Sequence, residues 1–274
     1  MPSSYPNIQT AIDNAQNGDT VLVNQDTLRG DGNKNISFQG KTILVVSELG
    51  ADSTIIDIEN EGRAFIFESE EDSMSVLDGF TILNGIMDLG GGISCLSKSN
   101  PTIRNIAISN CQSNNGGAIY VDHSSPTFIN CTMDSCKASI GGGMYLGNSS
   151  SEIISCALRN NEALGTTGSK GGGIYTSDFS DINIQNCILS VNESANGGGL
   201  YIEGQANVQA AGLRINNNIG YGIKMQYAQL NIENTVIKEN HGSGIRLISG
   251  IKTTISRSTI KHNGYYNLYN HSTV

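Results

Sequence analysis

The sequence contains no tryptophan and few charged residues. The shortage of charged residues excludes several classes of protein. Charged residues make up 15% of the 274 positions, which is too few for a typical coiled coil or disordered chain. No apolar stretch approaches the roughly 18 residues of a membrane-spanning helix, so we expect no membrane span. No cluster of Lys or Arg is present. We therefore expect no nucleic-acid partner, because contacts with phosphates supply most of that affinity.

Glycine is abundant instead, with 33 residues, and it is the residue that tight turns favour. The formal charge of −9 is unevenly distributed. Residues 1–137 carry 17 acidic and 7 basic side chains, whereas residues 138–274 carry 8 acidic and 9 basic side chains. The N-terminal half is therefore acidic and the C-terminal half slightly basic.

A short phrase of small residues followed by an apolar-x-apolar triplet recurs along the chain. Its copies start at Gly91, Gly116, Gly142, Gly172, Gly198, Gly222, Gly244 and Asn267. The middle residue of the triplet recurs at spacings of 22 to 30 residues. A fixed period in this range indicates a solenoid.

Alternation of apolar residues at every second position indicates that the repeats are strands rather than helices. A second short strand is expected in each repeat, at residues 103–108, 128–133, 153–158, 182–189, 208–213, 230–237 and 255–260. Two or three strands per turn, each stacked on its copy about 4.8 Å away, make a parallel β-helix. We expect an all-β fold of about 9–10 rungs.

The first residues predict a short helix that caps one end of this solenoid. Ile8, Ala11, Ile12 and Ala15 fall on one helical face, and Pro6 suits the first turn. Residues 1–18 are therefore expected to form a capping segment, and residues 19–274 a single β-helix.

The repeats and the opening resemble the right-handed parallel β-helix proteins of the pectate-lyase-like superfamily, in its generic bacterial form with Gly-Gly-Gly-Ile-Tyr and Asn-Cys-x-Ile phrases. This resemblance covers nearly the whole chain. It implies the fold but little about activity, because the superfamily includes lyases, hydrolases, epimerases, adhesins and scaffolds. We expect a secreted or cell-surface protein. The chain stops at Val274 soon after starting a new rung, so neighbouring domains of a larger protein are also expected.

Cysteine and asparagine recur at fixed repeat positions and are expected to be structural. Cys131, Cys156 and Cys187 share one position, and Cys111 and Cys136 another. We expect free buried thiols that pack as small apolar residues, and their spacing does not suit a zinc site. The asparagines are expected to hold turns and to hydrogen-bond along their column. They are Asn110, Asn160, Asn192, Asn216, Asn240 and Asn263.

Functional residues are expected in the column between the two inward apolar positions, which alternation places on the outer face of the strand. This column is Ile66, Ser94, Tyr120, Tyr145, Tyr175, Tyr201, Lys224, Arg246 and Tyr269. Its four consecutive tyrosines predict a flat, exposed aromatic strip along the axis. The next outward position adds Asp122, Ser177, Glu203 and Gln226, and the insertion 163–170 is expected to form a wall beside the strip.

Two interpretations of this strip stay open. Stacked rings stabilise neighbouring strands by ~0.5–1.5 kcal/mol per pair, so the column serves equally well as a structural ladder. As a ligand platform it would bind polysaccharide or a partner protein through Tyr120, Tyr145, Tyr175, Tyr201, Asp122 and Glu203. A non-catalytic binding protein is the leading hypothesis, and a structural spacer or adhesin stalk is an alternative.

An enzymatic alternative is a polysaccharide lyase that acts on uronate chains by β-elimination. Lys224 would be the base and Arg246 would neutralise the uronate carboxylate. Superfamily lyases usually add calcium, for which this chain offers only Asp122, Asp178, Asp181 and Glu203, spread over several rungs. No other cofactor and no other metal site is expected. A hydrolase is disfavoured because the paired aspartates of such enzymes are missing.

Overall fold

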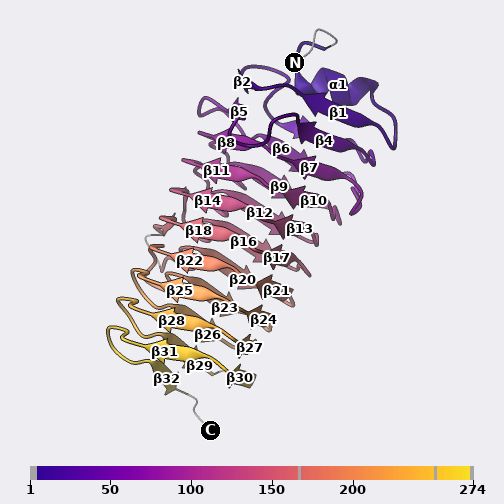
Figure 1. Cartoon of the computed structure of the whole chain (residues 1–274). Helices are drawn as coiled ribbons and strands as arrows, with labels where there is room; N and C mark the ends of the chain where they lie inside the picture. The colour runs from indigo at the N-terminus through magenta and orange to yellow at the C-terminus, as the bar shows by residue number, and fades with distance from the viewer. Residues whose placement is uncertain (1–4, 166–167, 250–251, 272–274) are drawn as a thin grey trace.

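The polypeptide winds into a parallel β-helix of ten turns (Figure 1). The computed structural model describes residues 5–165, 168–249 and 252–271. Each turn contributes one strand to each of three ten-stranded sheets, named A, B and C in chain order, and neighbouring strands pair in parallel. The predicted solenoid and its number of rungs are confirmed.

The strand bounds show how short each side of the solenoid is. Sheet A contains β1 (Thr20–Val23), β4 (Leu44–Ser47), β7 (Val76–Asp78), β10 (Thr102–Arg104), β13 (Thr127–Ile129), β17 (Glu152–Ile154), β21 (Asp181–Gln185), β24 (Asn207–Ala211), β27 (Gln229–Glu233) and β30 (Lys252–Ser256). Sheet B contains β2 (Asp26–Leu28), β5 (Thr54–Asp57), β8 (Thr81–Leu83), β11 (Ala107–Ser109), β14 (Thr132–Asp134), β18 (Ala157–Arg159), β22 (Ile188–Ser190), β25 (Arg214–Asn216), β28 (Val236–Lys238) and β31 (Thr259–Lys261). Sheet C contains β3 (Ile36–Ser37), β6 (Phe65–Phe67), β9 (Ile93–Cys95), β12 (Ile119–Asp122), β16 (Met144–Gly147), β20 (Ile174–Ser177), β23 (Leu200–Glu203), β26 (Ile223–Gln226), β29 (Ile245–Ile248) and β32 (Leu268–His271).

Each segment that was predicted as a single second strand, except 208–213, is in fact two strands, one in sheet A and one in sheet B; residues 208–213 belong to β24 and the bend before β25. The chain bends sharply between them at a residue in the left-handed region, such as Asn105 (φ 53°) between β10 and β11. Asn130, Asn186 and Asn234 repeat this bend in later turns. Asparagine tolerates this backbone conformation better than most residues, so its recurrence marks a corner that the apolar alternation alone does not reveal.

The helix α1 (Ile8–Asn14) covers the first turn, as expected for the capping segment. Ile8, Ala11 and Ile12 are buried against the core, and Asn7 caps the helix by accepting a hydrogen bond from the amide of Thr10. Pro6 lies before this cap rather than in the first turn of the helix. No helix among the described residues is long and apolar enough to cross a membrane.

The interior is a continuous apolar column that contains all six cysteines as buried free thiols, which confirms that prediction. The thiol of Cys187 accepts a hydrogen bond from the amide of Cys156, and the thiol of Cys156 accepts one from Cys131. The second cysteine column passes from Cys136 to Asn161, whose side-chain oxygen accepts from the Cys136 amide. Thiol and amide side chains thus fill equivalent positions inside the solenoid.

The asparagine prediction is correct in kind but wrong for some positions. The hydrogen-bonded ladder lies inside the solenoid and consists of Asn161, Asn192, Asn218, Asn240 and Asn263. Asn110 and Asn160 instead adopt positive φ in the turn just before this ladder, and Asn216 ends β25. Adjacent asparagines in one repeat therefore have two different structural roles.

The connections from sheet B to sheet C form an additional stack, which we call the connection ridge. One ladder of bridges joins Leu89, Asn115, Ile140, Lys170 and Asn196, and a second joins Ile86, Gln112, Lys137, Glu162, Glu193 and Ile219. No further bridge of this kind follows Ile219 among the residues that the structure describes. The ridge therefore flanks the middle turns and is absent from the last ones.

Candidate functional site

The predicted column on the outer face of sheet C is confirmed in its register. Paired residues run from Ile66 through Ser94, the four tyrosines, Lys224 and Arg246 to Tyr269. The predicted exposure of the tyrosines is wrong. Tyr120, Tyr175 and Tyr201 are only 8%, 5% and 2% exposed, and Tyr145 is half-buried.

The tyrosine rings are buried partly because they stack on one another. The ring centroids of Tyr120 and Tyr145 are 4.8 Å apart, those of Tyr145 and Tyr175 are 5.0 Å apart, and those of Tyr175 and Tyr201 are 5.9 Å apart. The ring faces thus contact neighbouring rings along the axis. The stack does not present the flat faces to solvent that a sugar platform requires.

The turns of the connection ridge cover the same rings. Gly171 has a φ of +63°, and a Cβ atom there would lie 2.8 Å from the Cβ of Tyr175. Gly197 makes an equally close approach to Tyr201. Only glycine permits this conformation and this proximity, so the glycine-rich phrase folds the chain down onto the tyrosines that follow it.

Charged groups complete the cover. Lys170, at the end of the insertion that was expected to form a wall, pairs with Glu203 at 2.6 Å and lies 5.5 Å from the ring centroid of Tyr201. Tyr175 also donates to Glu203, at 2.6 Å. Burial by itself raises the pKa of Glu203, but the hydrogen bonds from Lys170 and Tyr175 outweigh it and the net pKa is lowered. Burial raises the pKa of Tyr120 to about 12.

The structure does not bring the two predicted acidic ligands together. Glu203 is paired with Lys170, whereas Asp122 contacts His123 (3.0 Å) and Asn148 (3.2 Å) on earlier turns. No group of three or more His, Cys, Asp or Glu side chains among the described residues is placed to hold a metal ion. These carboxylates do not fit the calcium site that the resemblance implied.

Lys224 lies at the boundary between the covered and the open parts of the column. Its ammonium donates to the side chain of Asn196 in the connection ridge and lies 5.4 Å from the centroid of Tyr201. Burial lowers the pKa of Lys224, and the neighbouring Arg246 lowers it further. The residue is only 9% exposed, so most of the side chain is withdrawn from solvent.

Beyond Lys224 the outer face of sheet C opens into a cleft of about 250 Å³. Four tyrosines, one arginine and one serine line it: Tyr221, Ser243, Arg246, Tyr265, Tyr266 and Tyr269. Tyr265 and Tyr266 are 75% and 57% exposed. The rings of Tyr266 and Tyr269 stack with centroids 5.2 Å apart. Exposed tyrosine rings therefore gather here, whereas the rings of Tyr120, Tyr175 and Tyr201 over the middle turns are covered.

Arg246 lies among these rings. Its guanidinium is 5.0 Å from the ring centroid of Tyr221 and 5.7 Å from that of Tyr269, and it donates to the hydroxyl of Tyr221. Its Nε is buried and has no hydrogen-bond partner. No carboxylate in the described ranges forms an ion pair with Arg246. The cleft thus combines aromatic faces with a cation that has no counter-ion among the residues that the structure describes.

Sequence reasoning identified Arg246 and Tyr269 but missed Tyr221, Tyr265 and Tyr266. A signal was present in the repeat alignment. Tyr221 and Tyr266 stand three residues before the column, where the middle repeats have glycines such as Gly172 and Gly198. A large aromatic residue in place of this glycine, one position after the glycines that cover the tyrosine rings, would have indicated the open cleft.

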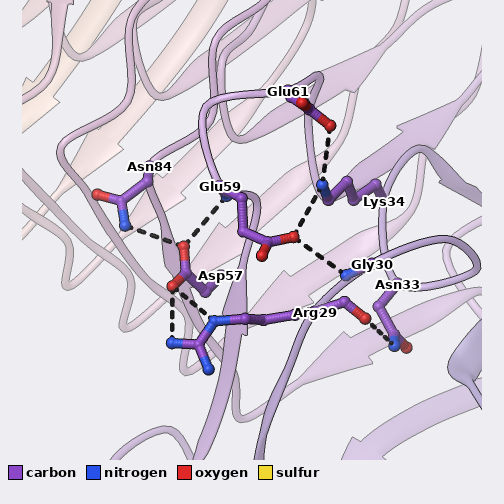
Figure 2. Close-up of polar contacts among 8 residues, drawn as sticks. All are labelled: Arg29, Gly30, Asn33, Lys34, Asp57, Glu59, Glu61 and Asn84. Carbon is purple, nitrogen blue, oxygen red and sulfur yellow. Dashed lines mark hydrogen bonds and ion pairs between the residues drawn. The ribbon is translucent and has the colours of Figure 1, made fainter.

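Charged residues of the first turns pair with one another instead of forming a site. Arg29 contacts Asp57 at 3.0 Å, and Lys34 lies between Glu59 (2.9 Å) and Glu61 (3.3 Å), as Figure 2 shows. A hydrogen bond from Asn84, together with those from the Glu59 amide and Arg29, lowers the pKa of Asp57 although partial burial opposes it. These contacts join loops of three successive turns, and their charges are satisfied within the protein.

Comparison with known proteins identifies a shared fold. The family described as "Right handed beta helix region" matches residues 15–198 and 117–274. No curated protein sequence matches the chain. Among solved structures, the A-module of mannuronan C-5 epimerase AlgE4 from Azotobacter vinelandii is 12% identical with a TM-score of 0.47, over 94% of this chain and 73% of that one.

Two further structures are similar at the same level. ORF18 of Geobacillus virus E2 is 13% identical with a TM-score of 0.49, over 96% of this chain and 56% of that one. A variant of the catalytic domain of a GH87 α-1,3-glucanase, in complex with nigerose, is 10% identical with a TM-score of 0.48, over 97% of this chain and 65% of that one. The chain thus spans less than two thirds of these two proteins, and the likenesses concern the fold alone.

Proposed function

The chain belongs to the family of right-handed β-helix proteins, and we propose that it binds polysaccharide in the open cleft at the C-terminal end of sheet C. One observation carries the proposal. Arg246, with no carboxylate partner among the described residues, lies within a cluster of tyrosines of which Tyr265 and Tyr266 are largely exposed.

The chemistry of these groups suits a sugar chain. Tyrosine rings offer apolar faces for the C–H surface of a pyranose, and their hydroxyls hydrogen-bond to sugar hydroxyls. The guanidinium of Arg246 donates hydrogen bonds to a hydroxyl or, more strongly, to a uronate carboxylate. The column continues along the solenoid axis, so a chain lying in the cleft extends toward Lys224.

A glycan-binding screen tests this proposal. Wild-type protein is measured against neutral and uronate polysaccharides by affinity electrophoresis, followed by titration calorimetry with the best binder. Tyr266→Ala and Arg246→Ala are each expected to weaken binding at least about tenfold, as loss of roughly 1.4 kcal/mol implies. Tyr227→Ala is the matched control, because Tyr227 is 55% exposed but does not line the cleft. Undiminished binding by both cleft variants would refute the proposal.

A uronate lyase is a second candidate function, and the lowered pKa of Lys224 favours it. The neutral amine of Lys224 would take the proton α to the carboxylate, and Arg246 would neutralise that carboxylate. The glycosidic C–O bond would break as the double bond forms, and the leaving oxygen would take a proton from water. Burial of Lys224 and its contact with Asn196 oppose access to substrate.

The lyase is tested by ultraviolet detection of unsaturated uronate products. Product from wild type that disappears in Lys224→Ala would support the assigned base, whereas product from Lys224→Ala would exclude it. If the screen finds neither binding nor product, the protein is better described as a spacer or adhesin stalk.

The cellular location and surroundings are part of the same proposal. Polysaccharide binding suits a secreted or cell-surface protein in a bacterium, joined to neighbouring domains of a larger protein. Fractionation of the source cells and immunodetection with antibodies against this chain test the location, and exclusively cytoplasmic protein would contradict it.

A further inference from the structure

The opposite end of the solenoid presents a free strand edge. β1 is the first strand of sheet A, and among the described residues its only neighbour in that sheet is β4. The carbonyls of Asp19 and Val23 accept hydrogen bonds from amides on the β4 side, at 3.0 and 2.9 Å. Backbone groups alternate in direction along a strand, so those of Thr20 and Leu22 point to the free edge.

These edge groups have no partner within the described chain. No hydrogen bond joins the backbone of Thr20 or Leu22 to a described residue outside β1 and β4. The side chain of Leu22 is also 48% exposed. An unpaired edge with exposed apolar side chains is a template for another strand.

A cleft of about 330 Å³ runs beside this edge, between β1 and helix α1. The helix contributes Ile8, Ala11 and Asn14, Ala15 follows at its C-cap, the preceding segment contributes Tyr5, and the strand contributes residues 20–23. The small side chains of Ala11 and Ala15 leave room for an apolar group. The cleft therefore offers backbone hydrogen bonds on one side and an apolar surface on the other.

The charge around this edge favours a basic partner. From Tyr5 to Leu28 the chain contains three acidic residues, Asp13, Asp19 and Asp26, and no Lys or Arg. Asp19 lines the cleft itself. The nearby Lys41 is committed to the helix, because its ammonium donates to the carbonyls of Ile12 and Asp13 at 2.6 and 3.0 Å.

We propose that an extended segment of a partner protein adds to the free edge of β1, with an apolar side chain in the cleft against Ala11 and Ala15 and a basic side chain beside Asp19. Such strand addition takes affinity from main-chain hydrogen bonds and specificity from alternate side chains. The site lies at the opposite end of the solenoid from the polysaccharide cleft and does not depend on it.

The probe is a blocked heptapeptide, Lys-Val-Thr-Val-Thr-Val-Lys, and the readout is amide hydrogen exchange in the full chain. The peptide is expected to slow exchange at Leu22 at least tenfold and to shift the Thr20–Val23 amide resonances. A peptide N-methylated at alternate residues, which lacks the bonding amides, is expected to have no effect. Equal protection by both peptides would overturn the proposal, because the main-chain pairing would then be unnecessary.

Two variants separate strand addition from a loss of folding. Leu22→Pro removes an amide at the free edge but leaves the backbone groups of Val21 and Val23 that face β4. Ala15→Phe fills the cleft and changes no residue of the strand. Both are expected to keep the wild-type circular dichroism spectrum and to reduce peptide affinity at least tenfold. Leu49→Ala, a change at an exposed leucine away from the cleft, is expected to bind like wild type. Unchanged peptide affinity in both folded variants, or protection of Leu22 by self-association without peptide, would overturn the assignment to a partner peptide.

Discussion

The outer face of sheet C is closed over β12, β16, β20 and β23 and still covered at Lys224 of β26, but it is open over β29 and β32, although both parts have the same alternation of inward and outward residues. In the closed part, Tyr201 is 2% exposed, whereas Tyr266 beside the open part is 57% exposed. An outward position in a solenoid is therefore not the same as an accessible one. The neighbouring connection decides whether the side chain meets solvent.

The physical difference lies in the turn that precedes the column. Three residues before the column, directly after the glycines that approach the tyrosines, the closed part has Gly172 and Gly198, and the open part has Tyr221, Ser243 and Tyr266. The repeat also shortens to 22 or 23 residues after Tyr201. With fewer residues and larger side chains at the turn, the ridge ends and the cleft appears.

The largest expected effect comes from adding a methyl group to the closed turn. In Gly172→Ala the new Cβ would lie 2.5 Å from the carbonyl oxygen of Glu193 and 2.7 Å from that of Gly198, and neither backbone atom can move freely. We expect a loss of about 3 kcal/mol in unfolding free energy, at the upper end of the usual cost of overpacking. Tyr266→Ala, at the equivalent open position, removes one ring stack at a largely exposed residue and is expected to change it by about 1 kcal/mol or less. Urea denaturation followed by circular dichroism measures both, and equal effects would break the comparison.

The internal asparagine ladder passes through both the closed and the open part. Its contribution to the unfolding free energy should decrease toward the open end. Asn192→Ala removes bonds to Asn161, Leu158 and Asn218 and leaves buried partners unsatisfied, so we expect a loss of about 2–3 kcal/mol. Asn263 is partly exposed, and water can replace its bonds. Asn263→Ala is expected to lose about 1 kcal/mol or less, and the same denaturation assay would reveal an opposite ranking.

Alkaline pH should destabilise the closed part. Burial raises the pKa of Tyr120 to about 12 from 10.0, and the pKa values of Tyr175 and Tyr201 are also raised, mainly by burial. The unfolded chain then loses these protons first, so stability is full below pH 10 and falls as pH rises above it. Tyr120 alone contributes a loss of up to about 1.4 kcal/mol per pH unit in this range. Denaturation at several pH values tests this, and Tyr120→Phe should reduce the slope.

Acidic pH should affect the cover of the tyrosine stack more modestly. The net pKa of Glu203 is lowered from 4.5 despite its burial, through Lys170 and Tyr175. Its stabilising contribution is therefore present above pH 4.5 and is lost as pH falls through the folded-state pKa. Glu203→Gln is expected to cost about 1 kcal/mol at neutral pH and to flatten the acid limb of the stability profile. A profile as steep as wild type would indicate that other groups control it.

The smallest change in unfolding free energy is expected for a substitution in the first turns. These turns serve as a reference for the closed and open parts of sheet C. Arg29→Ala removes an ion pair with Asp57, but the arginine side chain is 53% exposed. Exposed pairs contribute little because solvent screens them, so we expect a loss of about 0.5 kcal/mol or less by denaturation. A loss comparable to that of Gly172→Ala would mean that the N-terminal network stabilises the whole solenoid.

Particular residues show how far sequence reasoning reached. The order of the column from Ile66 to Tyr269 followed from alternation, because a strand has a period of two residues and stacked turns keep equivalent positions together. The division of each second strand did not follow, since a single residue with positive φ such as Asn105 makes the corner. The asparagine ladder was displaced by one or two positions at Asn160 and Asn216 for the same reason, because neighbouring asparagines differ only in backbone conformation.

The sequence by itself determined the solenoid, the capping helix, the buried thiols and the register of the outward column. The ten turns of the structure also lie within the predicted range of 9–10 rungs. These features depend on local periodicity and repetition. Only the tertiary structure decided which outward residues reach solvent, because that depends on how the connection ridge packs over the neighbouring strands. It buried the tyrosines that the repeat emphasises and exposed Tyr265 and Tyr266 around Arg246, where the ridge no longer covers sheet C.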